Sequence, residues 1–248
     1  MLRVCILALL ALVPVGLAAQ ALKVGVAQDR PPLSYSHDGQ VVGIGPDNAR
    51  AVGSLLNVEV QLVPMPYADL LRALQAGAVD VVMSGVPVTP ADSALVDFAA
   101  PYLRTGQMAI IRQADAGRLA FPWAVYGEGV RIGVQSGSAG EVFALAELQD
   151  AVVKTYAGAD AGLAALQGRE IDLFVHDPAT SWRLATSDRY PDLLALYEPL
   201  TEQALAWAVR RGDDALRARL DDSLATMRSR GVLDYILGRW IPVRTTSD

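Results

Sequence analysis

Apolar and polar positions along the first part of the chain follow an order typical of alternating strands and helices. The predicted strands and helices are, in order, Leu22–Ala27, Asp47–Leu56, Val58–Val63, Tyr67–Ala76 and Val79–Met83. The first, third and last of these are short β-rich runs, and the other two have apolar residues at helical spacing. Asp47 is the expected N-cap of the first helix. Strands that alternate with helices in this way predict a parallel α/β sheet with right-handed crossovers.

A second unit with the same alternation follows. Its predicted strands and helices are, in order, Val130–Gln135, Ala139–Gln149, Val152–Thr155, Ala159–Gln167 and Ile171–Val175. A long helix is then expected over Asp213–Arg230, because it has a continuous apolar stripe. The pattern therefore predicts two α/β units and a closing helix.

The N-terminus has the pattern of a secretory signal peptide. Within Met1–Ala21, Arg3 supplies a positive charge ahead of the apolar run Val4–Val15. Small residues follow, so cleavage is expected after Ala19 or Ala21. A membrane anchor is the alternative, but the run is shorter than the ~20 residues that a spanning helix needs. We therefore expect an exported, periplasmic protein.

Composition narrows the classes of function. The chain has 248 residues, of which 52% are hydrophobic and 19% charged, and its formal net charge is −6. This balance argues against a nucleic-acid partner. Cys5 is the single cysteine and lies within the predicted signal, so the mature chain is expected to have no disulfide, thiol catalysis or cysteine–metal site. No histidine pair has metal-binding spacing, so we expect no metal and no cofactor.

The stretch Val79–Leu103, VDVVMSGVPVTPADSALVDFAAPYL, resembles the core pattern of the bacterial extracellular solute-binding proteins of the amino-acid-binding family. The residues that match the family's pattern are Asp80, Ser84, Gly85, Thr89, Asp97, Phe98, Pro101 and Tyr102. Two positions depart from it: Pro87 replaces a threonine, and Asp92 replaces the arginine that binds the ligand's α-carboxylate in the family.

The resemblance extends over nearly the whole mature chain, through segments such as LKVGVAQDRPPLSY, IGVQSGSAGEVF and IDLFVHDPATSW. It implies a type II periplasmic-binding fold, in which two α/β lobes are joined by hinge strands, here near Met108–Arg112 and Leu205–Arg210. The first lobe would comprise residues 22–108 plus 208–248, and the second residues 109–207. The ligand would lie between the lobes, at the carboxyl ends of strands and at helix N-termini.

In the second lobe the resemblance implies that Asp177 pairs with an ammonium group of the ligand. The alternative is that Asp177 is only the N-cap of the helix that follows. His176 is a second candidate for ligand contact, although a lone histidine is more often structural. Ser136, Gly137 and Ser138 join a strand to a helix whose free N–H groups can bind a polar group. Simple helix capping is the alternative for this loop.

In the first lobe, Tyr67 takes the place of an aromatic wall of the family's pocket, or else is a core residue at a helix start. Arg30 stands where the family usually has an aromatic residue, and either contacts an anionic group or is solvated. Ser84, Gly85 and Val86 end a buried strand, where their backbone groups would face the cleft.

Asp92 bears most directly on the class of ligand. The sequence Thr89-Pro90-Ala91-Asp92 also reads as a capped helix start, so Asp92 either caps its helix or faces the cleft. An acid in place of the arginine would repel an α-carboxylate and tolerate a cation. With Asp29 and Asp177 it would form an acidic cleft. We therefore expect a ligand other than a standard α-amino acid, a cationic amine being one candidate.

These features predict a monomeric periplasmic protein that captures a small polar ligand for an ABC-type permease, without catalysis. One alternative is a sensor that delivers its signal to a membrane receptor or another partner. A less favoured alternative is an enzyme, because a branch of the family that this chain resembles contains periplasmic cyclohexadienyl dehydratases. They have a general-acid glutamate three residues after the aspartate that matches Asp177. That position is Thr180 here, which cannot donate a proton near neutral pH.

Overall fold

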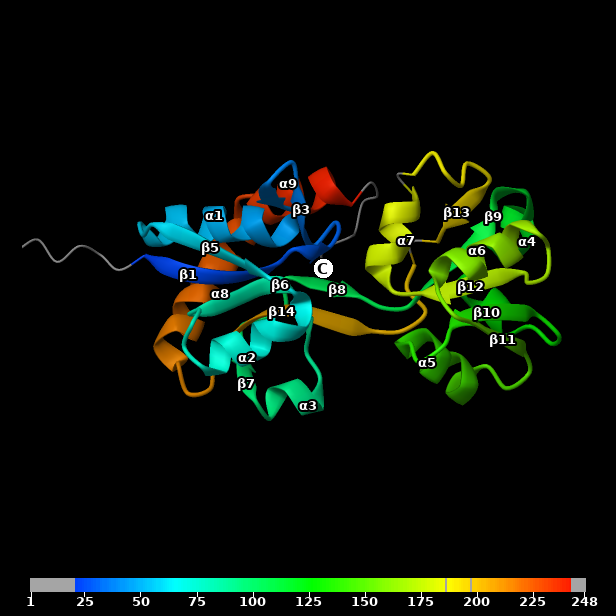
Figure 1. Cartoon of the computed structure of the whole chain (residues 1–248), viewed down its shortest axis with the longest axis horizontal. Helices are drawn as coiled ribbons and strands as arrows, with labels where there is room; N and C mark the ends of the chain where they lie inside the picture. Colours follow the sequence, from blue (N-terminus) through cyan, green and yellow to red (C-terminus); the bar gives the residue numbers. More distant parts are fainter. Residues whose placement is uncertain (1–20, 186, 197, 242–248) are drawn as a thin grey trace, which may run out of the picture.

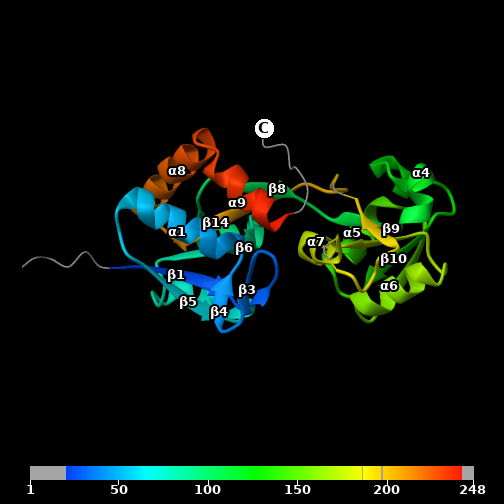
Figure 2. The ribbon, with the colours of Figure 1, turned by 90° about the horizontal axis from the view of Figure 1, so that it is seen from above.

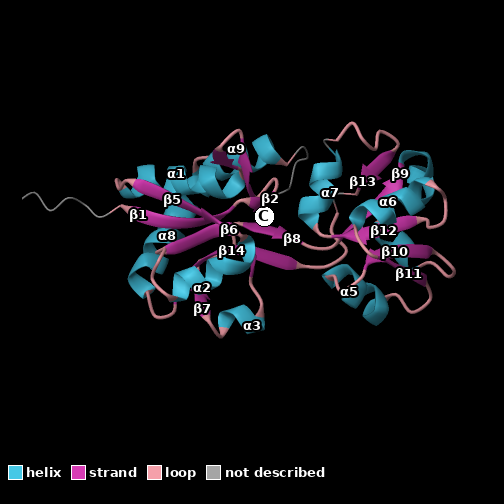
Figure 3. Cartoon of the chain, in the orientation of Figure 1, coloured by secondary structure: helices cyan, strands magenta, loops and turns pink. Residues whose placement is uncertain are grey.

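The computed structural model describes residues 21–241 except residues 186 and 197. These residues form two α/β lobes that lie side by side along the long axis of the molecule (Figure 1). Each lobe has a β-sheet with helices packed on it (Figure 3). The predicted α/β, two-lobed architecture is confirmed.

The sheet of the first lobe has the strand order β5-β1-β6-β14-β7, and β8 also pairs with β14. Its strands are β1 (Leu22–Ala27), β5 (Val60–Met65), β6 (Val81–Pro87), β7 (Val96–Phe98), β8 (Leu103–Thr105) and β14 (Gln203–Arg210). The first three strands are parallel, whereas β14 runs antiparallel to β6, β7 and β8. The parallel strands therefore share one carboxyl edge.

Helices cover both faces of this sheet (Figures 1 and 2). They are α1 (Ile44–Leu56), α2 (Leu70–Gln75), α3 (Pro90–Ser93), α8 (Asp214–Ser229) and α9 (Val232–Trp240). Val52 of α1 and Leu220 of α8 share a buried cluster with Val24 of β1. Leu70 and Leu74 of α2 lie in a separate cluster with other sheet residues. The helical spacing of these apolar residues explains why each helix buries one side.

A small antiparallel sheet follows β1 directly. It contains β2 (Asp29–Arg30), β3 (Ser34–His37) and β4 (Gln40–Val42). The hydroxyl of Ser34, which is fully buried, donates a hydrogen bond to the Ala27 carbonyl at 2.6 Å. This sheet was not predicted from the sequence, and it holds Arg30 beside the carboxyl end of β1.

The sheet of the second lobe has the order β11-β10-β12-β9-β13. Its strands are β9 (Met108–Arg112), β10 (Arg131–Gln135), β11 (Val152–Tyr156), β12 (Leu173–His176) and β13 (Leu193–Ala195). The helices of this lobe are α4 (Ala116–Leu119), α5 (Ala139–Glu147), α6 (Ala159–Gln167) and α7 (Pro178–Ala185). Ala144 of α5 and Leu163 of α6 belong to different buried clusters, so the two helices bury separate parts of the sheet.

The chain crosses between the two sheets after β8 and again before β14. The two crossings are hydrogen-bonded to each other, because the Gln107 N–H donates to Thr201 Oγ1 at 2.9 Å and the Leu200 N–H donates to the Gln107 carbonyl at 2.7 Å. The second hinge was expected near Leu205–Arg210, with residues up to 207 in the second lobe. In the structure β14 pairs with the first sheet from Gln203 onward, so the crossing precedes that strand.

Some predicted helix and strand ends differ from the structure. Helix α1 begins three residues before Asp47, and its N-cap is Gly43, whose φ of 126° favours glycine. Asp47 lies instead in the first turn of this helix, where its carboxylate accepts a hydrogen bond from the Trp240 indole at 2.8 Å. The expectation that Asp47 is the N-cap is therefore wrong, because the glycine turn starts the helix earlier.

The predicted signal peptide lies outside the described residues except for Ala21. Among the residues that the structure describes, no helix is long and apolar enough to cross a membrane.

Candidate ligand-binding cleft

Two cavities lie between the lobes and share Arg30 of the first lobe and Asp177 of the second. The larger has a volume of about 550 Å³ and the smaller about 150 Å³. The larger is lined by Asp29, Arg30, Pro31, Asp177, Thr180 and Arg183. The smaller is lined by Arg30, Leu33, Gly85, Pro87, Thr105, Gln107, Ala139, Asp177, Pro178, Gln203 and Leu205. Several of these residues follow the carboxyl ends of parallel strands, which is where α/β folds bind ligands.

Asp177 follows β12 and starts helix α7, which lies on the side of the second lobe that faces the first (Figure 1). One carboxylate oxygen accepts the Thr180 N–H at 3.1 Å, and the other accepts the Thr180 hydroxyl at 3.0 Å. Asp177 therefore caps α7 and also lines both cavities. The two interpretations of Asp177 from the sequence, an N-cap and a ligand-binding residue, are therefore compatible.

The carboxylate of Asp177 stays ionised over a wide pH range. Burial raises its pKa, but the hydrogen bond and positive charge of His176 and the bonds from Thr180 lower it to about 2. The side chain is 36% exposed, so part of the carboxylate remains open to a ligand. An acceptor that is ionised near neutral pH and lies in a cleft suits a ligand with an ammonium group.

His176 is buried, and its ring contacts both the carboxylate and the backbone nitrogen of Asp177. Its Nδ1 lies 2.5 Å from Asp177 Oδ2 and 2.8 Å from the Asp177 backbone nitrogen, and its Nε2 lies 2.9 Å from Gln135 Oε1. Nδ1 cannot both donate to the carboxylate and accept the backbone N–H. The 2.5 Å separation requires a proton between nitrogen and oxygen, so we assign donation to the carboxylate. His176 thus orients Asp177, and it is not among the residues lining the two cavities.

Ser138 caps helix α5 as its sequence suggests, but the Glu141 carboxylate accepts the N–H of Gly137, one residue before the cap. Ser138 Oγ accepts the Glu141 N–H at 3.2 Å, and the Gly137 N–H donates to Glu141 Oε2 at 2.7 Å. Ala139, the next residue, lines the smaller cavity. Ser136, Gly137 and Ser138 line neither of the two cavities, so ligand contact by these residues stays a prediction.

Arg30 and Tyr67 form a stacked pair on the first-lobe side of the cleft. The guanidinium carbon of Arg30 lies 4.1 Å from the centroid of the Tyr67 ring. The Tyr67 N–H lies 3.3 Å from an Asp29 carboxylate oxygen. Burial raises the pKa of the Tyr67 hydroxyl, while Arg30 lowers it and Asp92 raises it. Arg30, expected from sequence to be either ligand-binding or solvated, is half-buried and lines both cavities.

At the end of β6, the side chains of Ser84 and Val86 are buried in the first lobe, and Gly85 lines the cleft. Ser84 Oγ accepts the Ala27 N–H at 2.6 Å, and the Val86 side chain belongs to the buried core. Gly85 lines the smaller cavity with a φ of +68°, and a Cβ atom there would lie 2.6 Å from Leu33. The close approach of Leu33 explains the need for glycine at this position.

Asp92 is in the first turn of α3, whose N-cap is Thr89. Its N–H donates to Thr89 Oγ1 at 3.0 Å, and the Thr89 hydroxyl lies 2.8 Å from Asp92 Oδ2. Asp92 is also near enough to Tyr67 to influence its pKa. It lines neither of the two cavities, so ligand contact by Asp92 stays a prediction.

Three polar residues of the hinge were missed by the sequence analysis. Thr105 and Gln107 flank Gly106 at the first crossing, and Gln203 begins β14 after the second. All three line the smaller cavity. These residues could have been found from the sequence, because polar residues beside a glycine separate two apolar strands there. A Cβ at Gly106 would lie 1.5 Å from the Thr201 carbonyl oxygen, so glycine is required for the crossings to approach.

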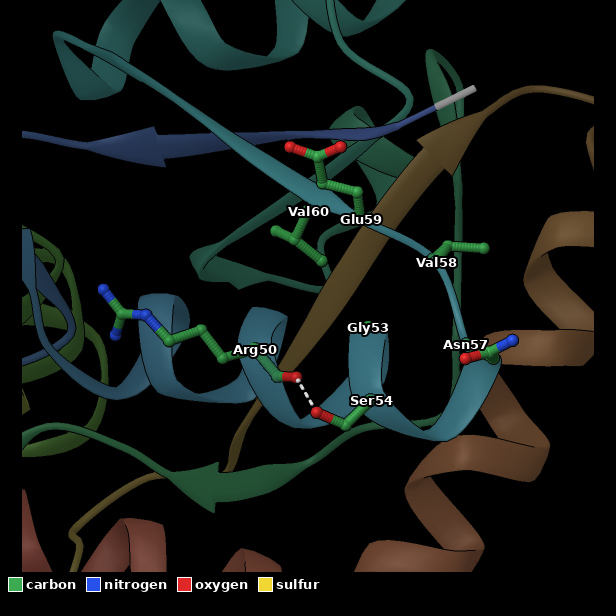
Figure 4. Close-up of a pocket in the computed structure, with 7 residues that line it drawn as sticks. All are labelled: Arg50, Gly53, Ser54, Asn57, Val58, Glu59 and Val60. Atoms are coloured by element: carbon green, nitrogen blue, oxygen red, sulfur yellow. Dashed lines mark hydrogen bonds between the residues drawn. The ribbon is translucent and has the colours of Figure 1, made fainter. Parts of the chain in front are cut away.

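A further cavity of about 450 Å³ lies in the first lobe, between the end of α1 and the start of β5 (Figure 4). It is lined by Arg50, Gly53, Ser54, Asn57, Val58, Glu59 and Val60. The Arg50, Asn57 and Glu59 side chains point in different directions (Figure 4), and Arg50 pairs with Asp47 at 2.9 Å. This cavity is at the amino end of β5, whereas α/β folds bind ligands at carboxyl ends. Within the described residues no group of three or more histidine, cysteine, aspartate or glutamate side chains is placed to bind a metal.

Two α/β lobes with charged residues from both in a shared cavity define a two-lobed ligand-binding protein. The family model for bacterial extracellular solute-binding proteins, family 3, matches residues 22–243. The chain therefore belongs to this family, as the resemblance implied.

Individual relatives include both binding proteins and an enzyme. An amino-acid-binding protein, AabA, of Dichelobacter nodosus is 31% identical over 224 residues, covering 86% of this chain and 85% of the relative. A cyclohexadienyl dehydratase of Pseudomonas aeruginosa is 26% identical over 231 residues, covering 92% and 85% of the two chains. A solved structure of an ancestral cationic amino acid solute-binding protein is 28% identical with a TM-score of 0.74, covering 89% of this chain and 95% of that one.

Proposed function

We propose that the protein is a monomeric periplasmic binding protein that captures a small polar solute between its lobes and delivers it to an ABC-type importer. The observation that supports this best is that both lobes line the same cavities, with Arg30 from the first and Asp177 from the second. Its family membership supports the extracellular location and solute binding. Binding needs only capture and release, and the two crossing segments are placed to allow the lobes to move.

The ligand we propose has a donor group, such as an ammonium, that binds the ionised carboxylate of Asp177. We propose that it is not a standard α-amino acid held in the family's usual orientation, because the resemblance implies that Asp92 replaces the carboxylate-binding arginine. Placing a negative charge near the expected carboxylate position opposes that orientation. Cationic amines are one class that satisfies both conditions.

A dehydratase activity is a weaker proposal, despite the dehydratase relative. The residue three positions after Asp177 is Thr180, whose hydroxyl is hydrogen-bonded to that carboxylate. A threonine hydroxyl cannot serve as a general acid near neutral pH. A sensor that binds the same solute but acts on a membrane receptor differs only in partner, so it predicts the same cleft.

A thermal-shift screen of the chain from Leu22 onward tests the proposal. The panel contains amino acids, polyamines, quaternary amines, small dicarboxylates and prephenate. A ligand at about 100 times its Kd stabilises the folded state by about 2.7 kcal/mol, which is readily detected. Stabilisation by at least one compound is expected. Absence of any shift, or turnover of prephenate in a coupled assay, would contradict the proposal of a binding protein without catalysis.

A further inference from the structure

We propose that Arg30 binds an anionic group of the ligand, so that the cleft selects solutes with an anion at one end and a cationic donor at the other. This inference rests on the proposed function, because it assumes that the ligand lies between Arg30 and Asp177. The resemblance implies that the family binds the ligand's carboxylate at the start of α3, where this chain has Asp92. We propose that the anionic group binds instead at Arg30, in β2.

The backbone of Arg30 is held in place independently of any ligand. Arg30 pairs with Ser34 across the β2–β3 ladder, and the buried Ser34 hydroxyl is bonded to the Ala27 carbonyl at the end of β1. The turn between these strands therefore ties Arg30 to the main sheet. A fixed backbone reduces the ordering cost of binding.

The side chain of Arg30 is also held in place while its donors remain available. Its guanidinium carbon lies 4.1 Å from the Tyr67 ring centroid. A guanidinium stacked on a ring keeps its N–H donors in its own plane, where they can bind a carboxylate in two places. Tyr67 thus serves as a platform for Arg30, rather than as a wall that the ligand must stack on.

The neighbouring acids do not neutralise Arg30. Within the part of the chain that the structure describes, the Arg30 guanidinium has no ion pair and no hydrogen bond to a protein group. Asp29 is directed to the Tyr67 N–H at 3.3 Å, and Asp92 is engaged with Thr89 at 2.8 Å. A half-buried arginine that lines two cavities without an acidic partner is suited to binding an anion supplied from outside.

The positions of the two charges define the class of ligand. Arg30 belongs to the first lobe and Asp177 to the second, and both line each cavity. A solute with separated carboxylate and ammonium groups satisfies both residues and joins the lobes. A diamine satisfies only Asp177 and is repelled by Arg30. We therefore infer a zwitterionic ligand, such as an ω-amino acid, in preference to a simple amine.

Isothermal titration calorimetry with probes of equal chain length tests this selectivity. The probes are δ-aminovalerate, norvaline, cadaverine and glutarate, each titrated into the chain from Leu22 onward, with shorter homologues of each as a second series. We expect δ-aminovalerate, whose carboxylate and ammonium groups lie at opposite ends, to bind about tenfold more tightly than cadaverine, which corresponds to about 1.4 kcal/mol. Arg30→Gln should remove this difference, and Arg30→Lys should restore it in part.

Arg50→Gln is the matched control, because it also removes one arginine but lies beside the cavity between the end of α1 and the start of β5. It should leave the selectivity unchanged. Arg183→Gln tests the other arginine that lines the larger cavity. Thermal unfolding of each variant checks that it remains folded.

The outcomes separate this inference from the proposed function. Equal or tighter binding of the diamine, unchanged by Arg30→Gln, would overturn the role of Arg30 and leave a solute-binding protein for amines. A loss of zwitterion binding in Arg183→Gln, with none in Arg30→Gln, would also overturn it. If no compound in either this series or the thermal-shift panel binds the native chain, both the inference and the proposed function fail.

Discussion

The two ends of strand β12 each have an aspartate whose pKa is lowered to about 2, yet the surroundings differ. Asp172 precedes the strand and Asp177 follows it. At Asp172 a hydrogen bond from Arg131 is the main cause, and it outweighs the opposing effect of burial. At Asp177 burial is the larger influence, and His176 and Thr180 together overcome it.

The difference between the two carboxylates lies in their partners and in the space around them. Asp172 accepts Arg131 Nη2 at 2.9 Å and Arg118 Nη2 at 3.3 Å, and its side chain is only 11% exposed. Asp177 is bonded only by residues close in sequence, is 36% exposed and lines both cavities of the cleft. A lowered pKa therefore does not by itself identify a binding residue, because a structural ion-pair network produces the same shift. Four predictions test this contrast.

The largest expected effect is on stability at the back of the second lobe. Asp172→Asn should lower the free energy of unfolding by about 3 kcal/mol, because the largely buried carboxylate accepts hydrogen bonds from the Arg131 backbone and side chain and from Arg118, and lies 3.8 Å from the buried Arg112. Ligand affinity should stay unchanged. Urea denaturation and calorimetry measure the two quantities. A stability loss under 1 kcal/mol would show that the network contributes little.

Asp177→Asn should give the reverse pattern. Asparagine is about as good an N-cap as aspartate, so α7 should keep its start and the stability loss should stay near or below about 1 kcal/mol. Ligand affinity should fall by roughly 30-fold, or about 2 kcal/mol, because the charged partner of the ligand's donor is removed. Calorimetric titration with the best ligand of the panel is the measurement. Unchanged affinity would limit Asp177 to capping.

Lowering the pH should reduce the difference in free energy of unfolding between the native protein and Asp172→Asn. A carboxylate whose pKa is lower in the folded state stabilises the protein above its unfolded-state pKa near 4. That contribution is lost as the pH falls toward about 2. The stability gap between the two proteins should therefore narrow by about 2 kcal/mol between pH 5 and pH 2. Denaturation midpoints across this range measure it, and a gap independent of pH would rule out the carboxylate charge as its source.

The smallest effect is expected for Thr180→Val. The valine removes the hydroxyl bonded to Asp177 at 3.0 Å but keeps the backbone N–H that donates to the other oxygen. Stability and affinity should each change by roughly 1 kcal/mol or less. A loss of affinity equal to that of Asp177→Asn would indicate direct ligand contact by the Thr180 hydroxyl.

Local patterns in the sequence were sufficient for many elements. Strand β1 and helix α6 have the bounds expected from periodicity alone, and α8 starts after Asp213, whose side chain accepts the Leu216 N–H as an N-cap should. These features depend on residues a few positions apart. The three-stranded sheet after β1 was missed because its strands are two to four residues long and give no clear period.

The candidate cleft was predicted in part. The family pattern placed Asp177 at a strand end, and the structure finds it at the cavity between the lobes. The sequence Thr89-Pro90-Ala91-Asp92 predicted a capped helix start, and the structure has Thr89 as the N-cap with Asp92 in the first turn. The hinge position of Gln107 was not predicted, because it depends on the approach of a second crossing almost a hundred residues away.

The sequence by itself indicated the family and the order of most strands and helices, and its resemblance to the family implied that Asp92 stands where an arginine is expected. These are properties of local spacing and of residue identity along one segment. Only the tertiary structure decided that Arg30 stacks on Tyr67 and shares its cavities with Asp177 of the other lobe. Those contacts join positions far apart in the chain, and only the relative placement of two sheets, set by their packing and by the paired crossings, brings them together.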